Sequence, residues 1–277
     1  MTDLDQVRQA LFNTTASRYE PLIMPAFGPL AESLVKKAAL RAETLVIDLG
    51  TGIGAAAFPA GRVAGRVVGL DYAPAMLPIA QRIGRQQHAP NVIFHQADMH
   101  RLPYRTDTFS VALASFGFNG VDPGQVFNEV RRILQAGGRL VLQEWGQVDE
   151  ASRIVKETVK AHRVEQAHGF LADLRVLGQT PRAWDELNDE EDIARLLRRI
   201  GFSQVDTFLE LEALPFEPLA FYRYKTAWAP YQAELEAMSP QERAAVEIEV
   251  IDHLNAWAGA DGRFMWKPEL IRIIARK

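Results

Sequence analysis

The sequence contains no cysteine among its 277 residues. Disulfide bridges, thiolate metal sites and cysteine nucleophiles are therefore excluded, and the chain suits a reducing compartment. No stretch approaches the ~20 apolar residues that a membrane-spanning helix needs, and residues 1–15 (MTDLDQVRQALFNTT) lack the basic start and apolar run of a secretory signal. We therefore expect a cytoplasmic protein that has no membrane span.

The sequence also lacks a strong excess of one charge. It holds 31 basic and 35 acidic residues, which leaves a formal net charge of −4. Domains that bind nucleic acids usually carry a basic surface, so we expect neither DNA nor RNA as a partner. Hydrophobic residues make up 48% and charged residues 24% of the chain. These fractions are typical of a globular protein with one large or two small domains.

Short β-rich runs alternate with helical patterns in the first half of the chain. This alternation is typical of an α/β protein in which helices cover both faces of a doubly wound parallel sheet. Seven runs are predicted to be strands, namely residues 44–49, 66–70, 91–97, 109–116, 139–145, 202–211 and 269–277.

Four segments carry the end signals or the apolar faces of helices. They are residues 123–136, 151–168, 189–200 and 240–258. In the first of them, Asp122 can cap the helix, Pro123 can occupy its first position and Gly137–Gly138 should end it. His162 and His168 fall in the second helix on nearly opposite faces, so they cannot share a metal ion. No metal site is predicted.

The most informative segment is residues 46–55 (VIDLGTGIGA), where a buried strand runs into three glycines. Glycines at such a turn let the backbone approach a ligand closely. Gly50, Gly52 and Ala55 fit the dinucleotide pattern G-x-G-x-x-G/A, and Asp71 follows at about the 20-residue spacing of a ribose-binding acid. On these features alone, an NAD-dependent oxidoreductase is a valid hypothesis.

Asp48 distinguishes NAD from another nucleoside cofactor. It lies two residues before Gly50, close to where a dinucleotide would place its doubly negative pyrophosphate. Two like charges in a partly dry site repel each other by several kcal/mol. S-adenosylmethionine carries an α-ammonium and a sulfonium and no phosphate, so an acid at this position favours S-adenosylmethionine over NAD.

Five blocks of sequence extend this hypothesis. They are residues 48–54 (DLGTGIG), 69–72 (GLDY), 74–77 (PAML), 96–104 (QADMHRLPY) and 131–140 (RRILQAGGRL). In order and spacing they resemble the class I S-adenosylmethionine-dependent methyltransferases, particularly the group around the ubiquinone and menaquinone biosynthesis methyltransferases. The resemblance covers roughly residues 12–146. It departs from the family at residues 109–111, where Phe-Ser-Val stands in place of the usual Phe-Asp-Val.

The resemblance implies a fold and a division of the chain. The fold would be a doubly wound, mostly parallel seven-stranded, Rossmann-like sheet with an antiparallel C-terminal strand and a helical lid. Residues 1–40 would form a helical segment over the cofactor, and residues 41–148 would form the core that binds S-adenosylmethionine. Residues 149–277 would form the lid and substrate-recognition region and add the last two strands. We expect a monomer or a homodimer.

The resemblance also implies a set of cofactor contacts. These are Tyr19, Asp48, Gly50, Thr51, Gly52, Asp71, Tyr72, Met76, Asp98, Met99 and Ser115. Asp71 would accept hydrogen bonds from both ribose hydroxyls, and Asp98 from the adenine amino group. Tyr19 would contact the cofactor from the lid. The alternatives are that Asp71 caps the helix after Pro74 and that Asp98 is an ordinary loop acid.

The acceptor side is less defined. Phe116, Phe118 and Asn119 follow the fourth strand and are predicted substrate contacts. This turn lacks the Asn/Asp-Pro-Pro-aromatic motif of enzymes that methylate nucleic-acid amino groups, so the acceptor should be a small molecule. No catalytic residue can be assigned, and Glu144 and His162 are the candidates for a base.

The aromatic-rich segment 202–266 packs either as core or as an apolar substrate pocket. The sequence therefore predicts methyl transfer from S-adenosylmethionine to a small apolar or aromatic acceptor. The alternatives are an NAD-dependent oxidoreductase and a non-catalytic cofactor-binding protein of the same fold.

Overall fold

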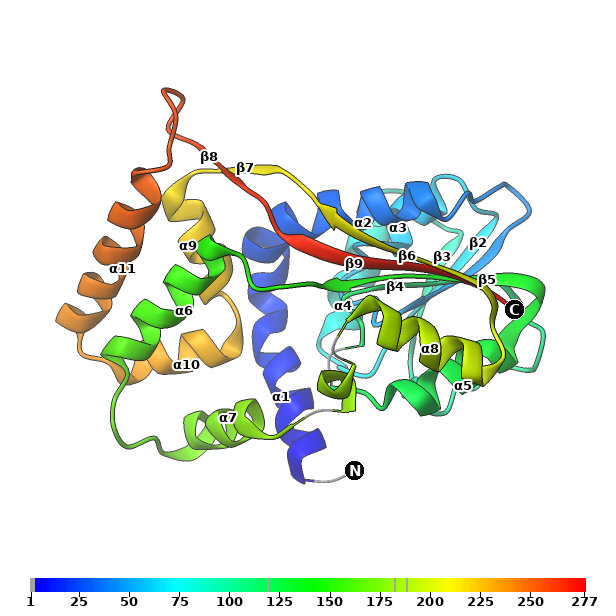
Figure 1. The fold of residues 1–277 in the computed structure, drawn as a ribbon, viewed down its shortest axis with the longest axis horizontal. Coiled ribbons are helices and arrows are strands. Elements are labelled where there is room, and N and C mark those ends of the chain that lie inside the picture. The colour runs from blue at the N-terminus through cyan, green and yellow to red at the C-terminus, as the bar shows by residue number, and fades with distance from the viewer. Residues whose placement is uncertain (1–2, 119, 182, 188) are drawn as a thin grey trace. The chain divides into compact units, whose positions relative to one another are not determined.

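The computed structural model describes residues 3–118, 120–181, 183–187 and 189–277 (Figure 1). The chain forms two compact units, each assembled from three segments. The sheet unit comprises Phe27–Gly146, Pro181–Glu210 and Leu270–Lys277, and the helical unit comprises Met1–Ala26, Gln147–Thr180 and Leu211–Glu269.

The sheet unit is built on a sheet that has, within the described ranges, seven strands in the order β3-β2-β1-β4-β5-β9-β6. The strands are β1 Leu45–Leu49, β2 Arg66–Asp71, β3 Val92–Gln96, β4 Phe109–Ser115, β5 Leu134–Trp145, β6 Ser203–Leu211 and β9 Glu269–Arg276. Strands β3, β2, β1, β4 and β5 pair in parallel, and β9 runs antiparallel to β5. The predicted α/β class, a doubly wound and mostly parallel Rossmann-like sheet with an antiparallel C-terminal strand, is confirmed.

Helices cover both faces of this sheet, and each face buries apolar side chains. The helices are α2 Met24–Lys37, α3 Ala57–Gly61, α4 Met76–Gln86, α5 Pro123–Ile133, the 3-10 turn η2 Ala183–Glu186 and α8 Glu190–Ile200. Figure 1 shows α5 and α8 on one side of the sheet and α2 and α3 on the other. Because β1 is covered on both faces, its run of Val46, Ile47 and Leu49 is fully buried.

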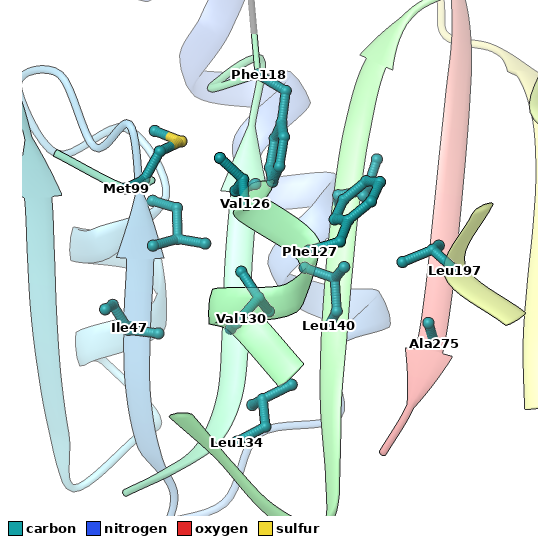
Figure 2. Packing of buried hydrophobic residues seen from close by; sticks show 14 of the residues in the cluster. Ile47, Met99, Phe118, Val126, Phe127, Val130, Leu134, Leu140, Leu197 and Ala275 are labelled. Carbon is teal, nitrogen blue, oxygen red and sulfur yellow. The ribbon is translucent and has the colours of Figure 1, made fainter. Parts of the chain in front are cut away.

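The core under α5 shows why this helix packs as it does. Its apolar stripe, which includes Val126, Phe127 and Val130, lies against residues of β1, β4 and β5 (Figure 2). These three side chains are fully buried. A spacing of three and four residues places them on one helical face, so the sequence pattern alone directs α5 onto the sheet.

The start of α5 is confirmed, and its predicted end is wrong. The Asp122 carboxylate accepts a hydrogen bond from the Gln125 N–H at 2.9 Å, with proline in the first turn. The helix ends at Ile133, because Leu134 is already extended and pairs with β4. Gly137–Gly138 therefore lie inside β5, where strand pairing decides the boundary in place of the glycine stop signal.

The helical unit contains the other described helices. They are α1 Asp3–Arg18, the π-helical turn η1 Tyr19–Ile23, α6 Glu150–His162, α7 Gly169–Gln179, α9 Pro218–Thr226, α10 Ala229–Ala237 and α11 Pro240–Asn255. The short strands β7 Leu214–Phe216 and β8 Phe264–Trp266 pair with each other. Phe221, Tyr224 and Trp266 pack together with ring centroids 5.4–5.8 Å apart and are at most 1% exposed. These aromatic side chains of segment 202–266 are core.

Two helix boundaries in this unit differ from the prediction. The capping box at Ser239 is present, but α11 ends at Asn255 and does not reach residue 258. The single helix expected over residues 151–168 is wrong, because α6 ends at His162 and His168 is the N-cap of α7. The break occurs where Arg163 becomes extended, so the two histidines lie on different elements. In the described part of the chain, no helix combines the length and apolar character required to span a bilayer.

Candidate functional site

The loop that follows β1 is a tight turn whose backbone conformation strongly favours glycine. Gly50, Gly52 and Gly54 have φ angles of 68°, 54° and 98°, in the left-handed region that other residues rarely adopt. The Thr51 N–H donates to the Leu70 carbonyl at 2.9 Å, which ties the loop to the end of β2. The predicted glycine turn therefore lies at the carboxyl edge of the parallel strands, where α/β proteins bind ligands.

A second loop, after β4, is in backbone contact with the glycine loop. A Cβ atom on Gly50 would lie 2.7 Å from the Cα of Gly117, and a Cβ on Gly117 would lie 2.4 Å from the carbonyl oxygen of Leu49. Real side chains do not tolerate such distances, so both positions require glycine. The sequence analysis did not identify Gly117, because a lone glycine after a strand is usually an ordinary turn residue.

Asp48 is a buried carboxyl group beneath the glycine loop that follows β1. It is 1% exposed, and its Oδ2 accepts a hydrogen bond from the Thr51 hydroxyl at 2.6 Å. Burial, and to a smaller extent the negative charge of Asp71, raises the pKa of Asp48 from 3.8 to about 7, although the Thr51 hydrogen bond lowers it. A bound cation would stabilise the ionised form of this group.

Asp71 lies at the end of β2 and orders the loops on either side. It is 7% exposed. Its Oδ2 accepts the Gly52 N–H and its Oδ1 accepts the Ala73 N–H, each at 2.8 Å. Burial raises its pKa as well. A carboxylate offers about four acceptor positions, so Asp71 can hold the glycine loop and still accept hydrogen bonds from a ligand.

Asp98 reaches the same edge of the sheet but has a different environment. The Ala97 N–H donates to the Asp71 carbonyl at 3.1 Å, which brings the loop after β3 to the end of β2. The Asp98 side chain is 67% exposed, and its Oδ1 lies 2.6 Å from Nδ1 of His100. Met99 is 5% exposed and packs in the core. The structure therefore brings Asp48 and Asp71 together and pairs Asp98 with a histidine.

Three further predicted cofactor contacts belong to the same unit. Tyr72 follows Asp71 directly and is partly buried, and Met76 begins α4 with 1% exposure. Ser115 ends β4, and its hydroxyl accepts a hydrogen bond from the Gln143 side chain at 2.9 Å. Their contacts with a cofactor stay predictions.

The predicted substrate contacts have separate environments. Phe116 has a φ angle of 59° and stacks on Trp145, with ring centroids 4.0 Å apart and an interplanar angle of 16°. Phe118 is fully buried and packs on Phe127 at 5.2 Å. Asn119 lies outside the described residues. Of these positions, Phe116 is the described one with a partly exposed side chain.

Glu144, one of the two candidate bases, is engaged by the backbone. It lies near the end of β5 and is 5% exposed. Its Oε1 accepts the Phe118 N–H at 2.9 Å. This hydrogen bond gives the carboxylate a structural partner in the loop that contacts the glycine turn.

Two predicted site residues belong to the helical unit. His162, the other candidate base, pairs with Glu249 at 3.2 Å. Tyr19 is 8% exposed and lies edge-on to Trp228, with ring centroids 5.9 Å apart. Their predicted roles stay predictions. Among the described residues of both units, no three metal-ligating side chains come together.

A polar row that the sequence analysis missed crosses the sheet from Ser115. Gln143 lies opposite Ser115 on β5, and Arg272 lies opposite Gln143 on β9. The guanidinium of Arg272, 1% exposed, donates from Nε to the Gln143 side-chain oxygen at 3.1 Å and pairs with Glu210. Lys37 also contacts Glu210, at 2.7 Å. The available signal was a lone charged residue within the apolar run of β9.

Comparison with known proteins identifies the family. Residues 47–142 match a family described as a methyltransferase domain. A demethylmenaquinone methyltransferase from Streptomyces avermitilis is 30% identical over 166 residues, which cover 58% of this chain and 68% of that protein. The chain belongs to the class I S-adenosylmethionine-dependent methyltransferases. Its cofactor is S-adenosylmethionine, which resolves the choice between this cofactor and NAD.

Two further relatives define the extent of the likeness. A demethylmenaquinone methyltransferase from Clavibacter sepedonicus is 28% identical over 167 residues. These residues cover 58% of this chain and 66% of that relative. The YcgJ protein from Bacillus subtilis has the same fold, with a TM-score of 0.57 and 17% identity over 89% of this chain and 97% of its own. The chain therefore spans just under two thirds of the Clavibacter relative's length.

Proposed function

We propose that this protein transfers the methyl group of S-adenosylmethionine to a small aromatic acceptor. The observation that carries the proposal is the pair of buried carboxyl groups, Asp48 and Asp71, at a glycine turn. Buried acids raise each other's pKa and stay ionised only when a positive charge or hydrogen-bond donors stabilise them. A cationic nucleoside supplies both.

Each acid has a role that its environment supports. Asp48 would attract the positive charges of the methionine portion, because it is the more deeply buried of the pair. Asp71 would hold the ribose hydroxyls with acceptor positions that the Gly52 and Ala73 N–H groups leave available. Asp98 and Met99 would contact the adenine, and Tyr72 and Met76 would lie against the adenosine.

Positioning is expected to supply most of the rate enhancement. S-adenosylmethionine brings a methyl group on a sulfonium, which is already a good leaving group. The chain therefore needs chiefly to hold the acceptor in line with that methyl group and to exclude water. The hydrogen bond from the Phe118 N–H to Glu144 favours a positioning role for this carboxylate over that of a base.

The proposed acceptor is a hydroxylated aromatic ring of the quinol class. Support comes from the named activity of the relatives, which are demethylmenaquinone methyltransferases. Aromatic side chains at the end of β4 and β5 offer a matching surface. Methylation at a ring carbon or at a hydroxyl oxygen would release one proton from the acceptor, and the electron pair of the broken methyl–sulfur bond would stay on sulfur in S-adenosylhomocysteine.

The test is a binding and turnover series. Isothermal titration should give heat with S-adenosylmethionine and none with NAD. Incubation with reduced benzoquinones and naphthoquinones should yield S-adenosylhomocysteine and a product heavier by one methylene unit, detected by mass spectrometry. Absence of cofactor binding would contradict the proposal, and binding without any product would favour the non-catalytic alternative.

A further inference from the structure

Three consecutive residues at the end of β5 contact Phe116 and Phe118, two of the three residues that follow β4. The Gln143 carbonyl accepts the Phe116 N–H at 3.0 Å. Glu144 Oε1 accepts the Phe118 N–H at 2.9 Å. Trp145 stacks on the Phe116 ring. The register of the sheet thus continues past the end of β4, and the loop of residues 116–118 has a fixed course.

That course includes local strain. A left-handed backbone at a residue with a side chain costs roughly 1–2 kcal/mol, and Phe116 adopts it with a φ angle of 59°. Gly117 next to it has no room for a side chain. Strain of this kind persists where surrounding contacts enforce it, and it occurs preferentially at functional sites.

The strained turn presents an aromatic surface. Phe116 and Trp145 lie nearly parallel, and Phe27 of α2 meets the Phe116 ring at 4.9 Å and 58° and the Trp145 ring at 5.7 Å and 69°. Trp145 remains 37% exposed. A stacked aromatic pair at the carboxyl edge, next to the glycine loop, is suited to hold a flat apolar ring.

We propose that Phe116 and Trp145, supported by the buried ring of Phe27, form the surface on which the planar ring of the acceptor lies, and that Glu144 is a positioning residue that holds this surface against the glycine loop. The inference rests on the proposed function and specifies the acceptor as flat and aromatic. Neither Phe27 nor Trp145 lies within a recognisable sequence motif.

Acceptor size provides the first test. Offset stacking is worth a factor of about 3 to 10 in binding, and a two-ring acceptor covers more of the surface than a one-ring acceptor. Trp145→Leu should raise KM for naphthohydroquinone about 3- to 10-fold, raise KM for benzohydroquinone less, and leave the Kd for S-adenosylmethionine within twofold. Trp257→Leu, at a 42% exposed tryptophan of the helical unit, is the matched control and should change none of these values.

A readout without turnover separates this inference from the proposed function. Binding of oxidised naphthoquinone should quench the fluorescence of the wild-type protein, and Trp145→Phe should retain the affinity while Trp145→Leu loses about 3- to 10-fold. If wild type binds the quinone but transfers no methyl group, the proposed function fails and the ring site stands. Equal quinone affinity in wild type and Trp145→Leu overturns the ring site whatever the turnover.

Glu144 is tested by the contrast between two substitutions. Glu144→Gln keeps a side-chain oxygen that can accept the Phe118 N–H, and Glu144→Ala does not. A positioning role predicts that Gln restores most of the activity that Ala loses and that the pH profile of kcat keeps its shape. If Glu144 acts as a base, Glu144→Gln and Glu144→Ala should lose activity equally, and that result would overturn the assignment. The Kd for S-adenosylmethionine of each variant shows whether the fold is intact.

Discussion

Asp48 should make the binding of S-adenosylmethionine depend on pH. Burial raises its pKa to about 7 in the ligand-free protein, so the carboxyl group is mostly protonated at pH 6 and mostly ionised at pH 8. A cation bound beside it favours the ionised form and lowers its pKa in the complex. Binding then releases a proton, and affinity rises with pH.

The size of the effect follows from this pKa. If Asp48 is ionised in the complex throughout this range, the protonated fraction of the free protein sets the change in apparent Kd. Between pH 6 and pH 8 the Kd should fall about 10-fold, which corresponds to roughly 1.4 kcal/mol. Below pH 6 the slope of log Kd against pH should approach minus one per pH unit.

The assay is calorimetric titration of S-adenosylmethionine at pH 6, 7 and 8 in wild type and Asp48→Asn. Asparagine keeps an oxygen that can accept the Thr51 hydroxyl, so the loop geometry is preserved. The ratio of the two Kd values also cancels titration of the ligand's own amino group. We expect the ratio to change about 10-fold across the range. A ratio that is constant with pH would refute the reasoning.

The same substitution should stabilise the ligand-free protein. The folded pKa of Asp48 lies above its unfolded value of 3.8, so its contribution is fully present below pH 3.8 and is lost as pH rises through about 7. At pH 8, Asp48→Asn should therefore raise the free energy of unfolding by roughly 2–4 kcal/mol. Urea denaturation of wild type and variant at pH 5 and pH 8 measures the difference, which should shrink at the lower pH.

Other positions give independent tests. Gly117→Ala should lower S-adenosylmethionine affinity at least 10-fold and stability by about 1–3 kcal/mol, because the new Cβ would lie 2.4 Å from a main-chain oxygen of β1; Gly178→Ala in α7 has open space and serves as the control. Lys225→Met should raise the free energy of unfolding at pH 7 by about 1–3 kcal/mol, since burial lowers the lysine pKa from 10.5 to about 8. That gain should vanish as pH rises from 8 through 10.5, as urea denaturation can measure. Glu210→Gln should lower stability by about 3–5 kcal/mol and Arg272→Met by less, because a neutral glutamine no longer compensates the charge of an arginine that is 1% exposed, whereas methionine leaves a glutamate that is 28% exposed and still contacts Lys37; equal losses in thermal denaturation would contradict this order.

The elements that the sequence predicted well are those with a complete local signal. β1 has a continuous apolar run because it is buried on both faces, and α5 has both a cap at Asp122 and an apolar stripe. The end of α5 was mispredicted because Leu134 pairs with Phe109 of β4. Such a pairing joins residues 25 positions apart in the chain, and no local pattern records it.

The candidate site divides in the same way. Asp48 and Asp71 were predictable, since each lies at the end of an apolar strand with glycine nearby, and the ends of parallel strands meet at one edge. The course of the loop after β4 was not predictable. Whether Glu144 faces a substrate or the Phe118 N–H depends on the left-handed turn at Phe116, and aromatic residues rarely adopt that conformation.

The three buried acids at the carboxyl edge differ in how their oxygens are used. Glu144 accepts a main-chain N–H of the β4 loop, and Asp71 accepts one N–H on each oxygen. For Asp48, the desolvation that accompanies burial outweighs the hydrogen bonds that it accepts and raises its pKa to about 7. A protein that required only a stable turn would gain stability with a neutral residue at position 48, because an ionised carboxylate is unfavourable there. An acid at position 48 is therefore favourable only when a positive charge binds beside it. S-adenosylmethionine supplies such a charge, whereas a dinucleotide would place its negative pyrophosphate there.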